Sequence, residues 1–157
     1  MSDLSSSIRN SAKAIIIRDG CVLLIRINDK DGEWYVLPGG GQRLGETLQE
    51  AVRRECMEEA DIDVQVGQLR LVREYIAKNH GAPECNRHVH RVEFMFECKI
   101  DGDAVPDNGK RPDSNQIGLV WVPLDDLTTY ELYPYGLGHI LRDGFDSAGC
   151  EYMGDVE

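Results

Sequence analysis

Short apolar runs rich in β-branched residues recur along this chain, separated by segments rich in glycine, proline, aspartate and asparagine. These runs predict strands over 12–18, 21–27, 34–37, 64–78, 91–100 and 117–122, the fourth of which is one long strand or two short ones. Asp19-Gly20, between the first two runs, predicts a tight hairpin. The stretch 46–60 lacks glycine and proline and predicts a helix, and a second helix is predicted over 133–141 despite its two glycines.

The first predicted helix carries three glutamates on the side that should face the core. At roughly 100° per residue, Glu55, Glu58 and Glu59 fall within an arc of about 100°, and apolar residues of the helix lie in or beside the same arc. Carboxylates so close repel one another, and burying even one without a partner is costly. A solvated acidic helix would explain the glutamates, but it would not explain why they share the apolar stripe. A hard divalent cation, Mg²⁺ or Mn²⁺, would neutralise them.

Three consecutive glycines, residues 39–41, lead into this helix. A plain tight turn would also use glycine. Glycine-rich loops, however, let the backbone approach phosphate oxygens, and the start of a helix favours anions. The glycines and the carboxylates together therefore predict a site that binds a metal ion and a phosphorylated ligand.

The residues in and after the glycine run follow a fixed spacing, Gly40-x5-Glu46-x7-Arg54-Glu55-Cys56-x-Glu58-Glu59-x-Asp61-Ile62. This pattern resembles the signature box of the Nudix hydrolases, and all the charged positions of that box are present. Two positions depart from it. Cys56 replaces an aliphatic residue, which is a mild change because a free cysteine packs as a small hydrophobe. Asp61 replaces a glycine at the helix end, where it has to adopt the left-handed conformation at the negative end of the helix dipole.

The resemblance implies an α/β fold, a Nudix-type α/β/α sandwich with a central mixed β-sheet. Residues 11–145 would form a single Nudix domain, with 1–10 as a flexible N terminus and 146–157 as a C-terminal tail. The run 117–122 followed by 123–127 resembles the strand and short helix with which the family often ends. Nudix domains often dimerise, so a homodimer is also compatible with the resemblance.

The resemblance also implies roles for residues of the box. Glu55, Glu58 and Glu59 would bind the metal ion together with the carbonyl of Gly39. Glu55 is the first choice, and Glu58 the second, for the base that activates water. Arg54 would orient these acids for catalysis.

The substrate would contact the box through Gly40 and Gly41. Arg26 would add a cation that meets a substrate phosphate, although an outward-facing strand residue explains this arginine equally well. Glu46, at the helix start, would pair with Arg54 and hold the loop and the helix together.

Further site residues are expected outside the box. Nudix enzymes often take another acidic ligand from elsewhere, and Glu93, Glu97 or Asp113 could supply it, although each could equally be a solvated acid. Glu93 and Glu97 would lie on one face of the strand over 91–100, opposite its apolar residues. A nucleobase could stack on an aromatic side chain, for which ordinary packing is the simpler role. The candidates are Trp34, Tyr35, Tyr133 and Tyr135.

Net charge and cysteine content narrow the class of protein. The formal net charge of −11 over 157 residues argues against nucleic acid or an anionic membrane as a bulk partner. This negative charge would also repel a small phosphorylated substrate unless bound metal ions make the charge at the binding site positive. The five cysteines include no CxxC pair, which favours a reduced cytoplasmic protein. The N terminus lacks the apolar core of a signal peptide, and no apolar run reaches membrane-spanning length.

The loop over 79–90 holds a cysteine and three histidines, spaced as Cys85-x2-His88-x-His90 after His80. No second cysteine pair completes a zinc module, and the spacing fits none. Solvated loop histidines are therefore expected. This loop and the one over 101–116 are where substrate selectivity would lie.

These features together predict a metal-dependent Nudix pyrophosphohydrolase that cleaves the diphosphate linkage of a nucleoside diphosphate derivative. A nucleoside triphosphate or an ADP-ribose-like substrate is favoured because the chain is a minimal domain. The alternatives are a non-catalytic Nudix-like nucleotide-sensing domain, an acidic protein-interaction module and an isomerase of the same fold. A sensing domain would have lost acids of the box, and none is lost here.

Overall fold

The computed structural model describes residues 7–112, 114–145 and 149–157. Its strands are β1 (Arg9–Arg18), β2 (Cys21–Asp29), β3 (Gly32–Val36), β4 (Gly39–Gly41), β5 (Val64–Ile76), β6 (His90–Ile100), β7 (Gln116–Pro123) and β8 (Glu151–Asp155). Its helices are α1 (Leu48–Ala60) and α2 (Leu137–Asp143), and 3₁₀ turns lie at Ala77–Asn79, Glu84–Asn86 and Leu124–Thr129. Within the described ranges, no helix has the length and apolar character needed to cross a membrane.

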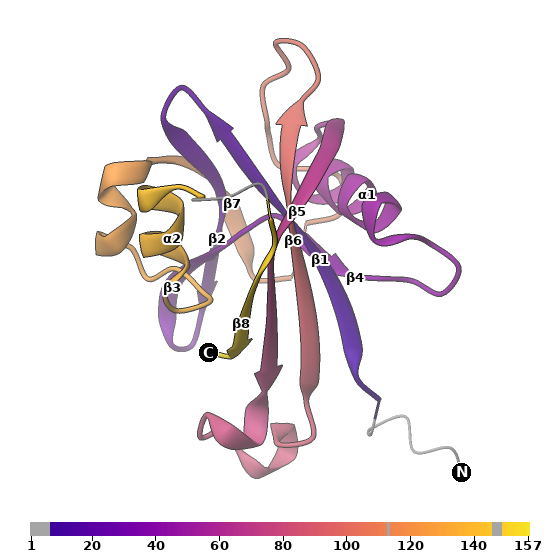
Figure 1. Cartoon of the computed structure of the whole chain (residues 1–157), viewed down its shortest axis with the longest axis vertical. Coiled ribbons are helices and arrows are strands. Elements are labelled where there is room, and N and C mark those ends of the chain that lie inside the picture. The colour runs from indigo at the N-terminus through magenta and orange to yellow at the C-terminus, as the bar shows by residue number, and fades with distance from the viewer. Residues whose placement is uncertain (1–6, 113, 146–148) are drawn as a thin grey trace.

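The strands form a mixed sheet with a helix on each side (Figure 1). Six of them lie in the order β3-β2-β1-β6-β5-β8, while β4 pairs with β1 and β7 pairs with β2. β1 and β6 are parallel, whereas β5 and β6 are antiparallel. The expected α/β/α sandwich with a central mixed sheet is therefore confirmed.

Two apolar clusters fill the space between the layers. Ala12 and Ala14 of β1 pack with Val52 of α1 in the first cluster, and Ile15 of β1 packs with Leu137 of α2 in the second. Successive side chains of a strand point to opposite faces, so β1 is buried on both sides. The alanines on one face of β1 leave room for α1 to lie close to the sheet, and this closeness brings α1 to the glycine strand β4.

The predicted hairpin joins β1 and β2. Asp19 and Gly20 have φ values of 53° and 74°, as a two-residue turn of this kind requires. β1 begins earlier than predicted, at Arg9, because its first half pairs with β4 and with β6. The predicted run 64–78 is one strand, β5, whose register against β6 shifts between residues 66 and 71.

The start predicted for the last helix was wrong. The helix was expected over 133–141, and α2 spans Leu137–Asp143. Gly136, just before it, has a φ of 88°, which lies outside the helical region and sets the helix start. The chain before this glycine follows β3 instead, and Tyr133 N donates to Tyr35 O over 3.0 Å.

The C-terminal residues include a strand that the sequence does not reveal. β8 pairs in parallel with β5 and forms one edge of the sheet (Figure 1). Its sequence, EYMGD, contains two acids and a glycine, which are poor strand formers. Its place depends on contacts with distant residues, among them Ile76 N, which donates to the carboxylate of Asp155 over 2.8 Å.

Two of the loop histidines are not solvated as predicted. His88 is exposed, but Nε2 of His80 lies 2.8 Å from Oδ1 of Asp155, and Nε2 of His90 lies 3.0 Å from Oε1 of Glu74. The carboxylates come from β8 and β5, which are far from these histidines in the sequence. The prediction failed because it considered the loop alone.

Candidate active site

α1 is bounded by caps that its own sequence supplies. Thr47 Oγ1 accepts a hydrogen bond from Glu50 N (3.1 Å), and the Glu50 carboxylate accepts one from Thr47 N (2.8 Å). This pair forms a capping box. Just past the other end, Asp61 adopts the left-handed conformation with a φ of 52°. The helix predicted over 46–60 is confirmed, with its first residue at Leu48.

Asp61→Gly is expected to stabilise the fold by about 0.5–1 kcal/mol. Glycine adopts a φ of 52° without side-chain strain, and the change removes a negative charge from the negative end of α1. The midpoint of urea unfolding at an unchanged m value measures the effect. Asp103→Gly is the control, since it removes the same charge at an exposed residue outside the positive-φ region. A lower midpoint for Asp61→Gly than for the wild type would contradict the expectation.

A loop segment closes the C-terminal end of α1. Arg111 N donates to Glu58 O (3.1 Å), and Gly109 N donates to Glu59 O (3.0 Å). Gly109 lies so close that a Cβ there would come within 2.0 Å of Glu58 O. The final carbonyls of a helix have no partner within the helix, so this segment supplies what the last turn lacks. It also fixes the backbone of two glutamates of the site.

The guanidinium of Arg54 joins the parts of the box. Its Nη2 lies 2.7 Å from Glu46 Oε1, and its Nη1 lies 2.8 Å from Glu55 Oε1 and 3.3 Å from Glu58 Oε2. Nη2 also donates to the carbonyl of Gly41 over 2.9 Å. The predicted pairing of Glu46 with Arg54 is confirmed. One cation thus holds three carboxylates and the glycine strand together.

The ion pair between Glu46 and Arg54 should make stability depend on pH. Hydrogen bonding from Arg54 lowers the pKa of Glu46 from 4.5 to about 2, against the opposing effect of burial. Because the folded-state pKa is the lower one, the stabilisation is complete above about pH 4.5 and is lost as the pH falls toward 2. Urea unfolding between about pH 6 and pH 3 should therefore show a steeper loss of stability in the wild type than in Glu46→Gln. Equal pH slopes for the two proteins would rule out this role for Glu46.

Glu59 and Glu55 lie against β4. Glu59 is only 2% exposed, and its Oε2 accepts a hydrogen bond from Gly39 N over 3.1 Å. The carboxyl group of Glu55 is so near Gly40 that a Cβ there would lie 2.7 Å from it. The glycines therefore form a short extended strand that the acids approach closely, rather than a plain turn.

Three cationic side chains that were not predicted as site residues lie beside β4. Lys13 Nζ donates to the carbonyl of Gly39 over 3.3 Å, and Arg43 Nη2 lies 3.4 Å from Glu58 Oε1. The guanidinium of Arg9 packs on the third glycine of β4, where a Cβ would come 2.4 Å from Nη2. Lys13 had a signal, since it is a single lysine inside an apolar run. The other two are ordinary surface arginines by sequence.

The carboxylates of the box are engaged with cations in this structure. Among residues 7–112, 114–145 and 149–157, no three His, Cys, Asp or Glu side chains form a ready metal-binding group. Arg54 holds oxygens of Glu55 and Glu58, and Lys13 donates to the carbonyl of Gly39. The donors are nevertheless carboxylate and carbonyl oxygens, which suit Mg²⁺ or Mn²⁺. Binding an ion among them requires these cationic groups to exchange partners.

Two predicted site residues lie away from the glutamates of α1 and the glycine strand β4. Arg26 Nη2 lies 2.9 Å from Glu33 Oε1 in a largely solvent-exposed ion pair between β2 and β3. Glu93 is buried on β6, where its Oε2 accepts a hydrogen bond from Arg73 Nε over 2.7 Å. Asp113, the third acid considered as a further ligand, lies outside the described residues. The structure therefore brings neither Arg26 nor Glu93 into contact with the acids of α1.

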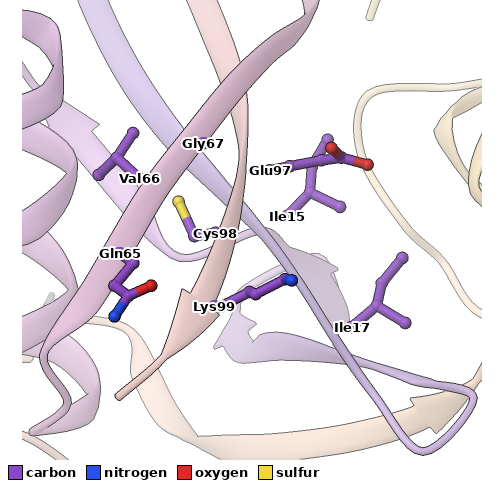
Figure 2. Close-up of a pocket in the computed structure, with 8 residues that line it drawn as sticks. All are labelled: Ile15, Ile17, Gln65, Val66, Gly67, Glu97, Cys98 and Lys99. Carbon is purple, nitrogen blue, oxygen red and sulfur yellow. The ribbon is translucent and has the colours of Figure 1, made fainter. Parts of the chain in front are cut away.

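Glu97 lines a separate hollow of about 410 Å³ (Figure 2). Its Oε2 lies 3.1 Å from Arg70 Nε. In Figure 2 the side chains of Glu97 and Ile15 extend to one side of the strands, whereas Val66 extends toward the other. The lining residues are Ile15, Ile17, Gln65, Val66, Gly67, Glu97, Cys98 and Lys99, none of which belongs to the box.

The aromatic candidates pack against one another. Trp34 and Tyr133 form an edge-to-face pair with ring centroids 5.6 Å apart, and Tyr35 forms another with Tyr130 at 5.0 Å. Tyr135 is the most exposed of the four candidates, at 52%. Mutual packing is thus their observed role.

Comparison with known proteins agrees with this geometry. A family model described as NUDIX domain matches residues 8–143. The chain is 31% identical over 140 residues to a MutT-like protein of Streptomyces ambofaciens. The matched residues make up 88% of this chain and 78% of that protein. It is 27% identical over 123 residues to nucleoside triphosphatase NudI of Salmonella newport, and the matched residues make up 75% of this chain and 84% of that protein. A solved MutT NUDIX hydrolase of Burkholderia pseudomallei matches with a TM-score of 0.66 and 29% identity, over 87% of this chain and 97% of that one.

The chain therefore belongs to the Nudix family, and it is a pyrophosphohydrolase by class.

Proposed function

We propose that this protein is a metal-dependent hydrolase that cleaves the diphosphate linkage of a nucleoside diphosphate derivative. The observation that carries the proposal is that Glu55 and Glu59 lie against the glycine strand β4, with Glu59 only 2% exposed, and that Arg54 joins Glu58 to the same strand. An acidic protein-interaction module would display its carboxylates to water. Burying one of them against a backbone N–H is costly unless the site uses it.

The donors that would hold Mg²⁺ or Mn²⁺ are Glu55, Glu58, Glu59 and the carbonyl of Gly39. When bound, the ion supplies positive charge that offsets the charge of the diphosphate and stabilises the charge that develops during cleavage. The protein needs such charge because its own net charge of −11 repels an anionic substrate.

Glu55 is the proposed general base. Its carboxylate lies beside Gly40 and 2.8 Å from Arg54 Nη1, which orients it and favours its ionised form. It takes a proton from the attacking water. The water oxygen bonds to one phosphorus while the bond from that phosphorus to the bridging oxygen breaks on the opposite side. Glu58, 3.3 Å from the same nitrogen, is the second candidate for this role.

The phosphate oxygens would meet the backbone of Gly40 and Gly41, which the Glu55 carboxyl group and the Arg9 guanidinium approach closely. Lys13 and Arg43 lie at the edges of β4 and carry the positive charge that phosphate oxygens attract. Arg26 is a candidate for the same role only if a substrate phosphate replaces Glu33 as the partner of its guanidinium.

The group attached to the diphosphate would bind next to β4. A small cavity there has a volume of about 20 Å³, enough for roughly one water molecule. Tyr133 and Pro134 form part of its wall, so a nucleoside can enter only when the segment that carries them shifts. The complete lining is Lys13, Val36, Leu37, Arg73, Glu93, Met95, Tyr133 and Pro134.

A nucleoside triphosphate is the favoured substrate, and an ADP-ribose-like compound is the second candidate. The relative NudI is named a nucleoside triphosphatase, which supports the first. The five cysteines are free thiols, and this supports a reduced, cytoplasmic location. The negative net charge supports a small nucleotide rather than bulk nucleic acid as the partner.

Chromatography of the reaction products with Mg²⁺ and Mn²⁺ tests the proposal, because ADP-ribose is cleaved to two phosphate monoesters without free phosphate. The panel holds nucleoside triphosphates, ADP-ribose and dinucleoside polyphosphates, and we expect release of a shorter nucleotide from at least one class only when metal is present. A nucleotide-sensing domain would bind a member of the panel in calorimetry and release nothing. An isomerase would convert its substrate without breaking the P–O–P linkage. Release that continues unchanged in EDTA would contradict metal dependence.

A further inference from the structure

The last seven residues of the chain form an edge that reaches toward the small cavity. β8 pairs with β5, and beyond it Val156 N donates to Glu74 O over 3.1 Å. The carboxylate of Asp155 accepts hydrogen bonds from Ile76 N and Asn79 Nδ2, each over 2.8 Å. Together with the contact from His80, these bonds attach the C-terminal residues to one end of β5.

Arg73 of β5 connects this edge to the cavity. The residue is 8% exposed. Its Nη1 donates to the carbonyl of Val156 over 2.5 Å, and its Nε donates to Glu93 Oε2 over 2.7 Å. A guanidinium is planar and rigid, so the directions of its N–H groups are fixed relative to one another. The bond from Nη1 to Val156 therefore restrains the direction in which Nε meets Glu93.

Two parts of the cavity lining are tied to residues 151–157. Arg73 and Glu93, from β5 and β6, line the cavity together with Tyr133. Tyr135 N, two residues beyond Tyr133, donates to the carbonyl of Glu157 over 2.6 Å. The segment that has to move to admit a nucleoside is thus held by Glu157.

Glu93 is a buried carboxylate beside two cations. Burial raises its pKa, but Lys13 and Arg73 lower it by more, so that the pKa lies below its usual value. An ionised carboxylate only accepts hydrogen bonds. In the cavity it favours a ligand edge that carries N–H donors, as nucleobases do.

We propose, on the basis of the function proposed above, that Arg73 is a positioning residue that aims the Glu93 carboxylate at N–H donors of the nucleobase, and that residues 151–157 hold Arg73 in this orientation. The C-terminal strand then sets which nucleobase the enzyme prefers. The phosphates and the metal ion bind elsewhere, at β4 and α1. Changes along this path therefore alter KM and base preference rather than kcat.

The test is steady-state hydrolysis of the common nucleoside triphosphates with Mg²⁺ by four proteins. These are the wild type, Arg73→Lys, a chain that ends at Cys150, and the two changes combined. For the preferred nucleotide, each single change is expected to raise KM about tenfold and to reduce the preference over the next nucleotide by a similar factor, with kcat little changed. The combined variant is expected to be no worse than the shortened chain alone, because the shortened chain already lacks the carbonyl that holds Arg73, besides the one that holds Tyr135 N.

Three further variants keep the result interpretable. If the shortened chain does not fold, Asp155→Ala replaces it, since that change removes the acceptor for Ile76 and Asn79 and leaves the chain intact. Glu93→Gln exchanges an acceptor oxygen for a donor and should change the order of base preference, which a purely structural role would not do. Arg53→Lys is the matched control, because that arginine forms an exposed ion pair with Asp63 on the outer side of α1.

The outcomes separate this inference from the proposed function. A wild-type enzyme that hydrolyses nucleotides, while Arg73→Lys keeps the same base preference, overturns the inference alone. Effects that multiply in the combined variant overturn it as well, and so does a wild type that shows no preference among bases. A wild type without metal-dependent hydrolysis overturns the proposed function, and the inference with it.

Discussion

Glu59→Gln is expected to lower kcat by about 10²–10⁴-fold while leaving the fold intact. Glutamine keeps an oxygen that can accept the hydrogen bond from Gly39 N, which lies 3.1 Å from Glu59 Oε2 in the wild type. The side chain also keeps its shape within a site where it is 2% exposed. The change removes the negative charge that the proposed divalent cation requires, and it replaces one acceptor oxygen with an NH₂ donor.

Nucleotide hydrolysis at saturating Mg²⁺, with thermal unfolding measured in parallel, tests this expectation for Glu59. Glu84→Gln is the control, since its side chain is 91% exposed and lies in the loop far from α1 in the sequence. The control should match the wild type in both measurements. Turnover at the wild-type rate in Glu59→Gln would remove the basis for a metal site among the box glutamates.

Arg54→Gln is expected to destabilise the fold by about 3 kcal/mol. The change leaves the carboxylates of Glu46, Glu55 and Glu58 crowded together without the cation that now contacts all three. The side chain of Arg54 is 17% exposed, so water offsets little of this repulsion. Added Mg²⁺ should recover part of the loss, because an ion that binds these oxygens supplies the missing positive charge.

The adjacent arginine provides a matched control for Arg54. Arg53 is 58% exposed and pairs with Asp63 over 3.1 Å, so Arg53→Gln should cost less than about 1 kcal/mol. Urea unfolding of both variants, with and without Mg²⁺, makes the comparison. Equal losses in the two variants, or no effect of Mg²⁺ on Arg54→Gln, would contradict the central role of Arg54.

The local parts of this structure could be predicted from the sequence. The capping box between Thr47 and Glu50, the Asp19-Gly20 hairpin and the pairing of Glu46 with Arg54 all depend on residues close in sequence or on the spacing of one motif. In these cases the chemistry of a few neighbouring side chains decides the conformation. The grouping of three glutamates beside the glycines followed from helical geometry in the same way.

The parts that escaped prediction depend on distant contacts. Nothing in EYMGD marks a strand, and β8 exists because β5 offers it an open edge. Lys13 reaches the carbonyl of Gly39 only because β1 and β4 pair. The buried pair of Arg73 and Glu93 likewise results from the register of β5 against β6, in which these two residues are partners. Without that register, the sequence offered Glu93 only as a further metal ligand or as a solvated acid, and not as the partner of a buried arginine.

The most direct test of the metal site is a calorimetric titration of Mn²⁺ into the wild type and into Glu59→Gln. The wild type should show saturable binding, and the variant should show a binding constant at least about tenfold weaker, because one of its carboxylate donors has lost its charge. Identical isotherms for the two proteins, together with normal nucleotide hydrolysis by both, would contradict a site in which the glutamates of α1 hold the ion beside β4.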